Sequence, residues 1–150
     1  NYNEMRTKEA ENIAEDFFQY LENIEENLSD IKKKSKNNSK IELIKLKKRI
    51  KELVEENSFD ENRLEMELAI IADRIDISEE CSRLKSHINQ FREIYDTRNE
   101  VGKALTFVLQ EMLRETNTIG SKTTVVDISH KVIKIKEDIE KIREQIQNLE

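Results

Sequence analysis

The stretch from Ile128 to Leu149, ISHKVIKIKEDIEKIREQIQNL, decides the fold class of this chain. Its apolar residues recur at alternating spacings of four and three over three heptads, which is the pattern of a helix packed along another helix. This apolar face comprises Ile128, Val132, Ile135, Ile139, Ile142, Ile146 and Leu149. We therefore predict a long, coiled-coil-like C-terminal helix that packs against a partner, either within the chain or on another subunit.

The composition of the whole chain is typical of an all-helical protein. Its 150 residues include no proline and only two glycines, and 39% of them are charged. Few residues therefore interrupt a helix, and with 5% aromatic residues the core is built from Leu, Ile and Val. We predict an all-α fold, an antiparallel helical bundle with the coiled-coil-like helix at its C-terminal end.

Two further features of the composition bear on where the protein resides. No apolar run approaches the ~20 residues that a membrane-spanning helix needs, and no signal peptide is visible. The single Cys81 cannot form an intrachain disulfide and lies on an apolar face, as a small buried hydrophobe would. We expect a cytoplasmic protein without a membrane partner.

Breaks in the apolar pattern divide the first part of the chain. Apolar spacing from about Met5 to Ile31 predicts one helix, and residues 41–56 predict a second. The stretch 33–40, KKSKNNSK, has no apolar residue and carries Ser and Asn, so it predicts a turn between antiparallel helices. Residues 1–59 are thus predicted to form a helical hairpin.

The remainder, residues 60–150, is predicted to form a second helical domain. The polar segment Asn57–Asp60 separates it from the hairpin. Within it, the apolar pattern changes phase at Asp76–Ser78, which predicts a kink or a new helix start, with Ser78 as the cap.

Charge is distributed unevenly along the chain, although the net charge is only −6. Residues 1–30 carry nine acidic against two basic residues, whereas residues 32–52 carry ten basic against two acidic residues. Such a basic block is able to contact phosphate backbones. The alternative is a solvated helix face paired with the acidic segment.

The two glycines, Gly102 and Gly120, bracket a segment with many hydrogen-bonding side chains at helical spacing. An arginine and carboxylates within one turn are able to hold a phosphate and a metal or water. The alternative is a buried polar network that fixes the register between helices. Gly120 itself is typical of a helix C-cap, while the Gly120–Lys122 triplet offers backbone N–H groups and a cation to an anion. The polar residues of this segment are Gln110, Glu111, Arg114, Glu115 and Asn117.

A second polar set lies on the helix predicted after Ser78. Glu79, Glu80, Arg83 and His87 flank its apolar face at helical spacings. Two carboxylates and an imidazole are able to bind Mg²⁺ or Mn²⁺, especially when a substrate phosphate completes the shell. The alternative is an ordinary salt-bridged flank with a surface histidine.

Three blocks of sequence resemble the C-terminal region of the bacterial YicC/YloC family. They are ENRLEMELAIIADRIDISEECSRLKSHINQFR at 61–92, VGKALTFVLQEMLRETNTIGSK at 101–122 and KIREQIQNLE at 141–150. The resemblance extends over about residues 60–150. The matching charged and polar positions are Arg63, Glu65, Glu67, Arg74, Asp76, Glu79, Glu80, Arg83, His87, Gln110, Glu111, Arg114, Glu115, Asn117, Ser121 and Lys122.

The resemblance implies a cytoplasmic, metal-dependent endoribonuclease that acts on single-stranded RNA and assembles as a homo-oligomeric hexamer. Full-length members also carry an N-terminal α/β half, so we expect this chain to correspond to the C-terminal helical part. The alternative is that this part is a non-catalytic oligomerisation scaffold, whose polar clusters fix the register of its interfaces. A plain coiled-coil adaptor is a third interpretation.

For the endoribonuclease hypothesis we assign a role to each candidate residue. Divalent metal, Mn²⁺ or Mg²⁺, is expected on Glu80, Glu111 and Glu115. His87 is expected to act as acid or base, with Glu111 and Glu115 as the other catalytic groups. Arg83, Arg114 and Lys122 are expected to neutralise RNA phosphate. Glu79, Gln110, Asn117 and Ser121 are expected to support these groups.

Overall fold

A computed structural model of the chain describes residues 2–54, 61–97 and 102–149, and all its regular elements in those ranges are helices. The all-α prediction is therefore confirmed. The helices are α1 (Tyr2–Val54), α2 (Glu61–Ile75), α3 (Ser78–Thr97), α4 (Gly102–Lys122) and α5 (Val126–Leu149). None of the helices over the described residues is long and apolar enough to cross a membrane.

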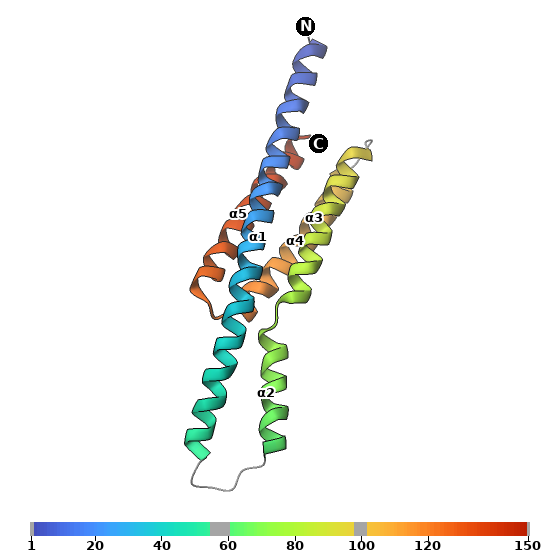
Figure 1. Cartoon of the computed structure of the whole chain (residues 1–150). Coiled ribbons are helices and arrows are strands. Elements are labelled where there is room, and N and C mark those ends of the chain that lie inside the picture. Colours follow the sequence, from blue (N-terminus) through green and yellow to red (C-terminus); the bar gives the residue numbers. More distant parts are fainter. Residues whose placement is uncertain (1, 55–60, 98–101, 150) are drawn as a thin grey trace.

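The helices form a bundle with a two-helix extension (Figure 1). The N-terminal half of α1 packs against α3 and α5, α4 packs against α3 and α5, and α2 lies beside the C-terminal half of α1. α1 and α4 run in one direction and α2, α3 and α5 run in the other, so neighbouring helices in the bundle are antiparallel. We call residues 32–54 of α1 together with α2 the arm.

The core of the bundle is built from the apolar faces that the heptad pattern predicted. On α5, the predicted face from Ile128 to Ile146 is buried, and α5 packs against α1 and α4. The partner of this helix therefore lies within the chain. Phe17 of α1 meets Phe91 of α3 edge to face, with ring centroids 5.9 Å apart. The other helices contribute mainly Leu, Ile and Val, as the composition indicated.

The predicted turn at residues 33–40 is wrong, because α1 is a single helix of 53 residues. The stretch contains no Gly or Pro, and lysine is a good helix former, so a polar sequence alone does not end the helix. The half-buried Ser35 and Ser39 continue the phase of Ile31 toward Leu43. Small polar residues thus replace apolar ones along the same helix face, and residues 2–54 form one helix instead of a hairpin.

The other predicted boundaries have mixed outcomes. A new helix begins at Ser78, as the change of phase predicted. Gly102 begins α4, but Gly120 is not a C-cap, because α4 continues to Lys122. A Cβ at Gly120 would lie 3.2 Å from Val132 Cγ1, so this glycine permits the close approach of α4 and α5. The predicted break at Asn57–Asp60 lies outside the described residues, and the division at residue 60 stays a prediction.

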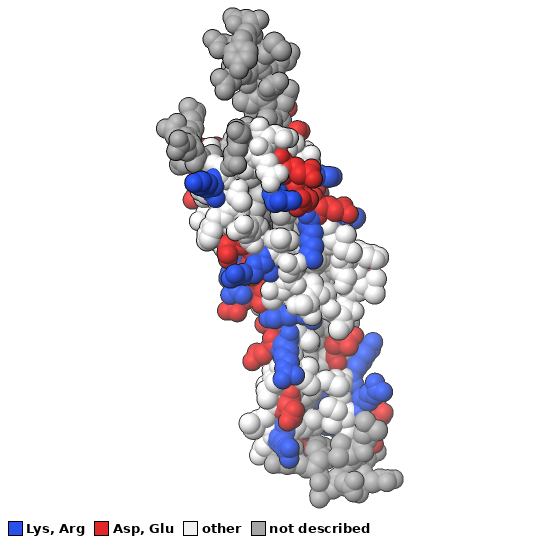
Figure 2. Space-filling view, turned by 180° about the vertical axis from the view of Figure 1, so that it is seen from behind, with Lys and Arg blue, Asp and Glu red and all other residues white. Residues whose placement is uncertain are grey.

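Two acidic residues of α1 form ion pairs with neighbouring helices of the bundle. Glu25 pairs with Lys85 and Arg92 of α3, and Asp30 pairs with Lys131 of α5 at 3.1 Å. Because α1 is continuous, its basic block cannot fold back onto this acidic segment. Figure 2 shows the molecule from behind, with Lys and Arg side chains interspersed with Asp and Glu side chains over its lower half.

Candidate functional site

The candidate site lies where α2 ends, α3 begins and α4 ends. Between α2 and α3, the Asp76 side chain accepts a 2.9 Å hydrogen bond from the Ser78 backbone N–H and another from the Ser78 hydroxyl. These hydrogen bonds stabilise the carboxylate and lower the pKa of Asp76. Asp76 therefore supplies the acceptor at this break, whereas the sequence predicted that Ser78 would act as the cap.

The first turn of α3 places the carboxylate of Glu80 against the end of α4. Glu80 is only 3% exposed, and its Oε1 accepts a 2.8 Å hydrogen bond from Lys122 Nζ. Lys122 also donates to the Asp76 backbone carbonyl at 3.2 Å. The second oxygen, Oε2, is buried and has no hydrogen-bond partner among the described residues. Glu80 is thus a buried carboxylate with one satisfied oxygen.

One turn further along α3, Arg83 connects this carboxylate to α4. Its Nε donates to Glu115 Oε1 at 3.0 Å, and its terminal nitrogens lie 3.6 Å from Glu80 Oε1 and 3.7 Å from Glu79 Oε2. The hydrogen bond to Glu115 raises the pKa of Arg83. Glu80, Arg83, Glu115 and Lys122 therefore form one ion-pair cluster, which joins four of the predicted site residues.

The antiparallel register of α3 and α4 also relates His87 to Glu111. Because Arg83 pairs with Glu115, a step of four residues forward on α3 and four backward on α4 brings His87 level with Glu111. Both side chains are half-buried. His87 and Glu111 thus extend the polar side chains between α3 and α4 by one turn beyond the ion-pair cluster.

The remaining predicted site residues lie on the exposed surface of the helices. Arg114 and Asn117 are exposed, and the Ser121 hydroxyl is bound to the Thr118 carbonyl of its own helix at 3.0 Å. Gln110 lines a separate groove between α4 and α5. Over the described residues, no hydrogen bond or ion pair connects these side chains to the ion-pair cluster. Glu79 joins the cluster only through Arg83.

A preassembled metal centre does not fit the described part of the chain. There, no group of three or more His, Cys, Asp and Glu side chains is placed to hold a metal ion. The carboxylates of Glu80 and Glu115 instead accept hydrogen bonds from Lys122 and Arg83. At most two cluster carboxylates, with the buried Glu80 Oε2 as an unused acceptor, are available for a ligand.

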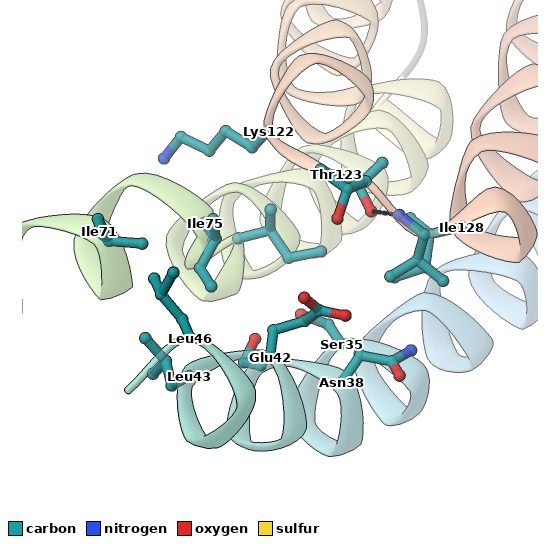
Figure 3. Close-up of a pocket in the computed structure, with 14 residues that line it drawn as sticks. Ser35, Asn38, Glu42, Leu43, Leu46, Ile71, Ile75, Lys122, Thr123 and Ile128 are labelled. Atoms are coloured by element: carbon teal, nitrogen blue, oxygen red, sulfur yellow. Dashed lines mark hydrogen bonds between the residues drawn. The ribbon is translucent and has the colours of Figure 1, made fainter. Parts of the chain in front are cut away.

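A hollow of about 180 Å³ adjoins the cluster at Lys122 (Figure 3). It lies between the arm and the connection from α4 to α5, and Figure 3 shows Lys122 extending toward α2 over it. The sequence analysis missed this hollow. The sequence feature that indicates the hollow is the pair Ser35 and Ser39. These small residues occupy positions of the apolar helix face where larger side chains would fill the space. The apolar residues that line it include Leu43, Leu46, Ile71, Ile75, Ile77, Val125 and Ile128.

This geometry defines an all-helical domain in which a partly buried cluster of ion pairs lies between two antiparallel helices. The model of the family described as "Endoribonuclease YicC-like, C-terminal" matches residues 31–150. The chain therefore belongs to the YicC-like endoribonuclease family, as the resemblance indicated.

Two curated relatives, each named "Probable endoribonuclease YicC", show how far the similarity extends. The chain is 43% identical to that of Clostridioides difficile over 148 residues, which cover 98% of this chain and 50% of the relative. It is 42% identical to that of Haemophilus influenzae over 93 residues, which cover 62% of this chain and 32% of the relative. The chain thus spans at most about half the length of these relatives.

Proposed function

We propose that this chain is the C-terminal part of a metal-dependent endoribonuclease that hydrolyses phosphodiester bonds of single-stranded RNA in the cytoplasm. The observation that carries the proposal is the family match over residues 31–150. The name of the two relatives, probable endoribonuclease, supports the RNA-cleaving reaction. We further propose that the whole protein assembles as a homo-oligomer, with the hexamer of the family as the expected state.

The cations of the cluster are suited to RNA phosphate. The Arg83 side chain is 49% exposed, so its guanidinium holds Glu115 and also presents N–H groups to solvent. Lys122 and Arg114 add positive charge at the end and on the exposed side of α4. We assign these three residues to phosphate binding and to stabilisation of the charge that develops on phosphorus oxygens.

The acidic and imidazole groups are assigned to the reaction itself. His87 and Glu111 lie level with each other, half-buried, and next to the cluster along the same pair of helices. A histidine in such a position is suited to transfer the proton of the attacking water or of the leaving oxygen. We assign His87, Glu111 and Glu115 to catalysis, with Glu79, Gln110, Asn117 and Ser121 in support.

Divalent metal enters the proposal through Glu80, Glu111 and Glu115. Mg²⁺ is commonly held by one or two carboxylates together with substrate phosphates, and Mn²⁺ accepts similar oxygen ligands. When bound, such an ion supplies charge neutralisation at the phosphate. Because the described residues offer no complete ligand set, we propose that RNA phosphate contributes the missing oxygens.

The ion pairs themselves favour a second function, that of an oligomerisation scaffold. Glu80 and Glu115 are neutralised by Lys122 and Arg83, as expected of a network that fixes helix register. Under this interpretation, RNA cleavage belongs to the part of the relatives that this chain does not match.

A nuclease assay separates the two functions. The chain and its full-length parent are each incubated with fluorescein-labelled single-stranded RNA and Mn²⁺, with EDTA as the metal control. Glu111→Gln and Glu115→Gln are introduced in both, with Glu137→Gln on the exposed face of α5 as the matched control. We expect the first two variants to reduce cleavage by about 100-fold or more, and the control variant to leave it unchanged.

Cleavage by the parent that persists in both Glu→Gln variants of α4 would overturn the assignment of these residues and favour the scaffold. Circular dichroism of each variant shows whether a loss of activity reflects a loss of fold. Light scattering tests assembly separately, since a monomeric parent contradicts the proposed oligomer.

A further inference from the structure

The continuity of α1 leaves its basic block without the acidic partners that the sequence suggested. Two acidic residues of α1 pair with α3 and α5, whereas residues 32–51 carry ten basic residues along the arm. Within the described ranges, only Lys34 and Lys47 of this block form ion pairs, with Asp127 and Glu65. Most of this positive charge therefore faces solvent.

Three of these lysines are aligned along one groove. Lys32, Lys36 and Lys40 follow one another at intervals of four residues, so their Cα atoms rise by about 6 Å per step on one face of α1. All three are exposed and line a groove of about 550 Å³ between the arm and the start of α3.

Other groups of the groove complement this row of charge. Hydroxyl groups are supplied by Ser35 and Ser39 of α1 and by Ser82 of α3, whereas the Ser78 hydroxyl already donates to Asp76. The acidic side chain on the groove, Asp76, is already engaged by the Ser78 N–H and hydroxyl. Its apolar lining is formed by Leu43, Ala72, Ile75, Ile77 and Cys81.

Asp76 relates the groove to the ion-pair cluster. It lines the groove, and its backbone carbonyl receives the Lys122 ammonium at 3.2 Å. Lys122 in turn binds Glu80. The groove and the cluster therefore meet at Asp76, at the break between α2 and α3.

We propose that this groove is the track for the phosphate backbone of single-stranded RNA. The inference rests on the proposed function and locates its substrate on this half of the protein. Three lysines at regular intervals of four residues are suited to successive phosphates of a single strand, because each neutralised phosphate releases counterions. An acidic protein partner would use the same charge, and the experiment below distinguishes the two.

Fluorescence anisotropy of a fluorescein-labelled 12-nucleotide single-stranded RNA, titrated with this chain in EDTA, measures binding without cleavage. The test variant is the triple substitution Lys32→Gln, Lys36→Gln and Lys40→Gln. The matched control replaces Lys45, Lys48 and Arg49 by Gln. These residues are exposed and lie on the same helix, roughly 120° to 180° around its axis from Lys36.

We expect the groove triple to weaken RNA binding about ten-fold or more. The plot of the logarithm of the association constant against the logarithm of the salt concentration has a negative slope, and its magnitude should decrease by about 2. The control triple is expected to weaken binding less than about two-fold. Equal losses in both triples, or an unchanged affinity in the groove triple, would overturn the track. The proposal would also fail if the unaltered chain did not bind RNA. It would fail as well if polyglutamate, at the same concentration of charge, displaced the labelled RNA as effectively as unlabelled RNA does.

The same variants in the full-length parent separate this inference from the proposed function. If the parent cleaves RNA and its groove triple retains wild-type binding, the track fails while the endoribonuclease assignment stands. If the groove triple loses binding but the wild-type parent never cleaves, the endoribonuclease assignment fails while the RNA-binding groove stands.

Discussion

Arg83 on α3 and Glu115 on α4 are joined by an Nε–Oε1 hydrogen bond of 3.0 Å, although the carboxylate side chain is 9% exposed and the arginine side chain 49%. A buried carboxylate is thus neutralised by a cation that remains accessible from solvent. The pair fixes the register of α3 against α4, and this register brings His87 level with Glu111. Any change in the pair therefore affects both stability and the proposed site.

Loss of the Lys122 ammonium should destabilise the protein, because it leaves the buried Glu80 carboxylate without its closest cation. We expect Lys122→Met to lower the free energy of unfolding by about 1–3 kcal/mol, measured by urea denaturation followed by circular dichroism. Lys134→Met on the exposed face of α5 should change it by less than about 0.5 kcal/mol. Adding Glu80→Gln to Lys122→Met should restore part of the loss; a further additive loss would contradict this account.

Glu25 should make the stability of the bundle depend on pH. Partial burial acts to raise the pKa of Glu25, but hydrogen bonds and charge interactions with Lys85 and Arg92 outweigh it and lower the pKa. The stabilisation is therefore fully present above the pKa of the unfolded state, about 4.3, and is lost as the pH falls through the lowered pKa of the folded state.

The melting temperature of Glu25→Gln at pH 7 and pH 3 tests this dependence. The variant should melt below the wild type at pH 7, and the difference should shrink toward pH 3. Glu26→Gln removes the same charge from the adjacent exposed position and serves as the control. A difference that is the same at both pH values would contradict the ion-pair account.

Removal of an isoleucine side chain should reduce the free energy of unfolding far more on the buried face of α5 than on its exposed face. Ile135 is fully buried and Ile133 is 54% exposed, although the two residues are chemically identical and two positions apart. We expect Ile135→Ala to cost about 2–5 kcal/mol through lost burial and a cavity, and Ile133→Ala less than about 0.5 kcal/mol. Chemical denaturation of both variants checks the expectation, and similar losses would contradict the packing of α5.

The continuity of α1 predicts that proline is not tolerated at Asn37. Proline in a helix interior removes a hydrogen bond and clashes with the preceding turn, so Asn37→Pro should cost about 3 kcal/mol or more and reduce ellipticity at 222 nm. Asn37→Ala should instead be neutral or slightly stabilising, because alanine favours the helix. If Asn37→Pro were as stable as the wild type, residues 33–40 would form a turn after all.

Cys81 should be unreactive in the folded protein. Its side chain is buried, and burial raises the pKa of the thiol to about 11, so thiolate is scarce at pH 8. Ellman's reagent should label it slowly under native conditions and rapidly in 6 M urea, with Cys81→Ser as the blank. Rapid labelling without denaturant would contradict the burial of this thiol.

The parts of the fold that were predicted from sequence are those set by periodicity. The heptad face of α5 and the phase change at Asp76–Ser78 required only the positions of apolar residues, and the structure confirms both. The predicted turn at 33–40 failed because polarity was taken as the end of a helix. A helix interior beside a groove tolerates Ser, Asn and Lys, provided that Gly and Pro are absent.

In the candidate site, contacts within one helix were predicted from the sequence, whereas contacts between two helices were not. Helical spacing within α3 correctly grouped Glu80 with Arg83, because neighbours on one helix follow from sequence distance alone. The pairings of Arg83 with Glu115 and of Lys122 with Glu80 depend on the register between two helices. No local pattern encodes that register, so the cluster emerged only from the packed structure.

The two sides of the arm differ mechanically. α1 passes from bundle to arm without interruption, whereas the return path through α2 and α3 is broken at Asp76–Ile77. One side of the arm is therefore a continuous helix, and the other side has a break next to Lys122. We expect a tilt of the arm to bend α1 and to move Asp76, whose carbonyl receives Lys122. Because Lys122 also binds Glu80, such a tilt would alter the ion pair of that buried carboxylate.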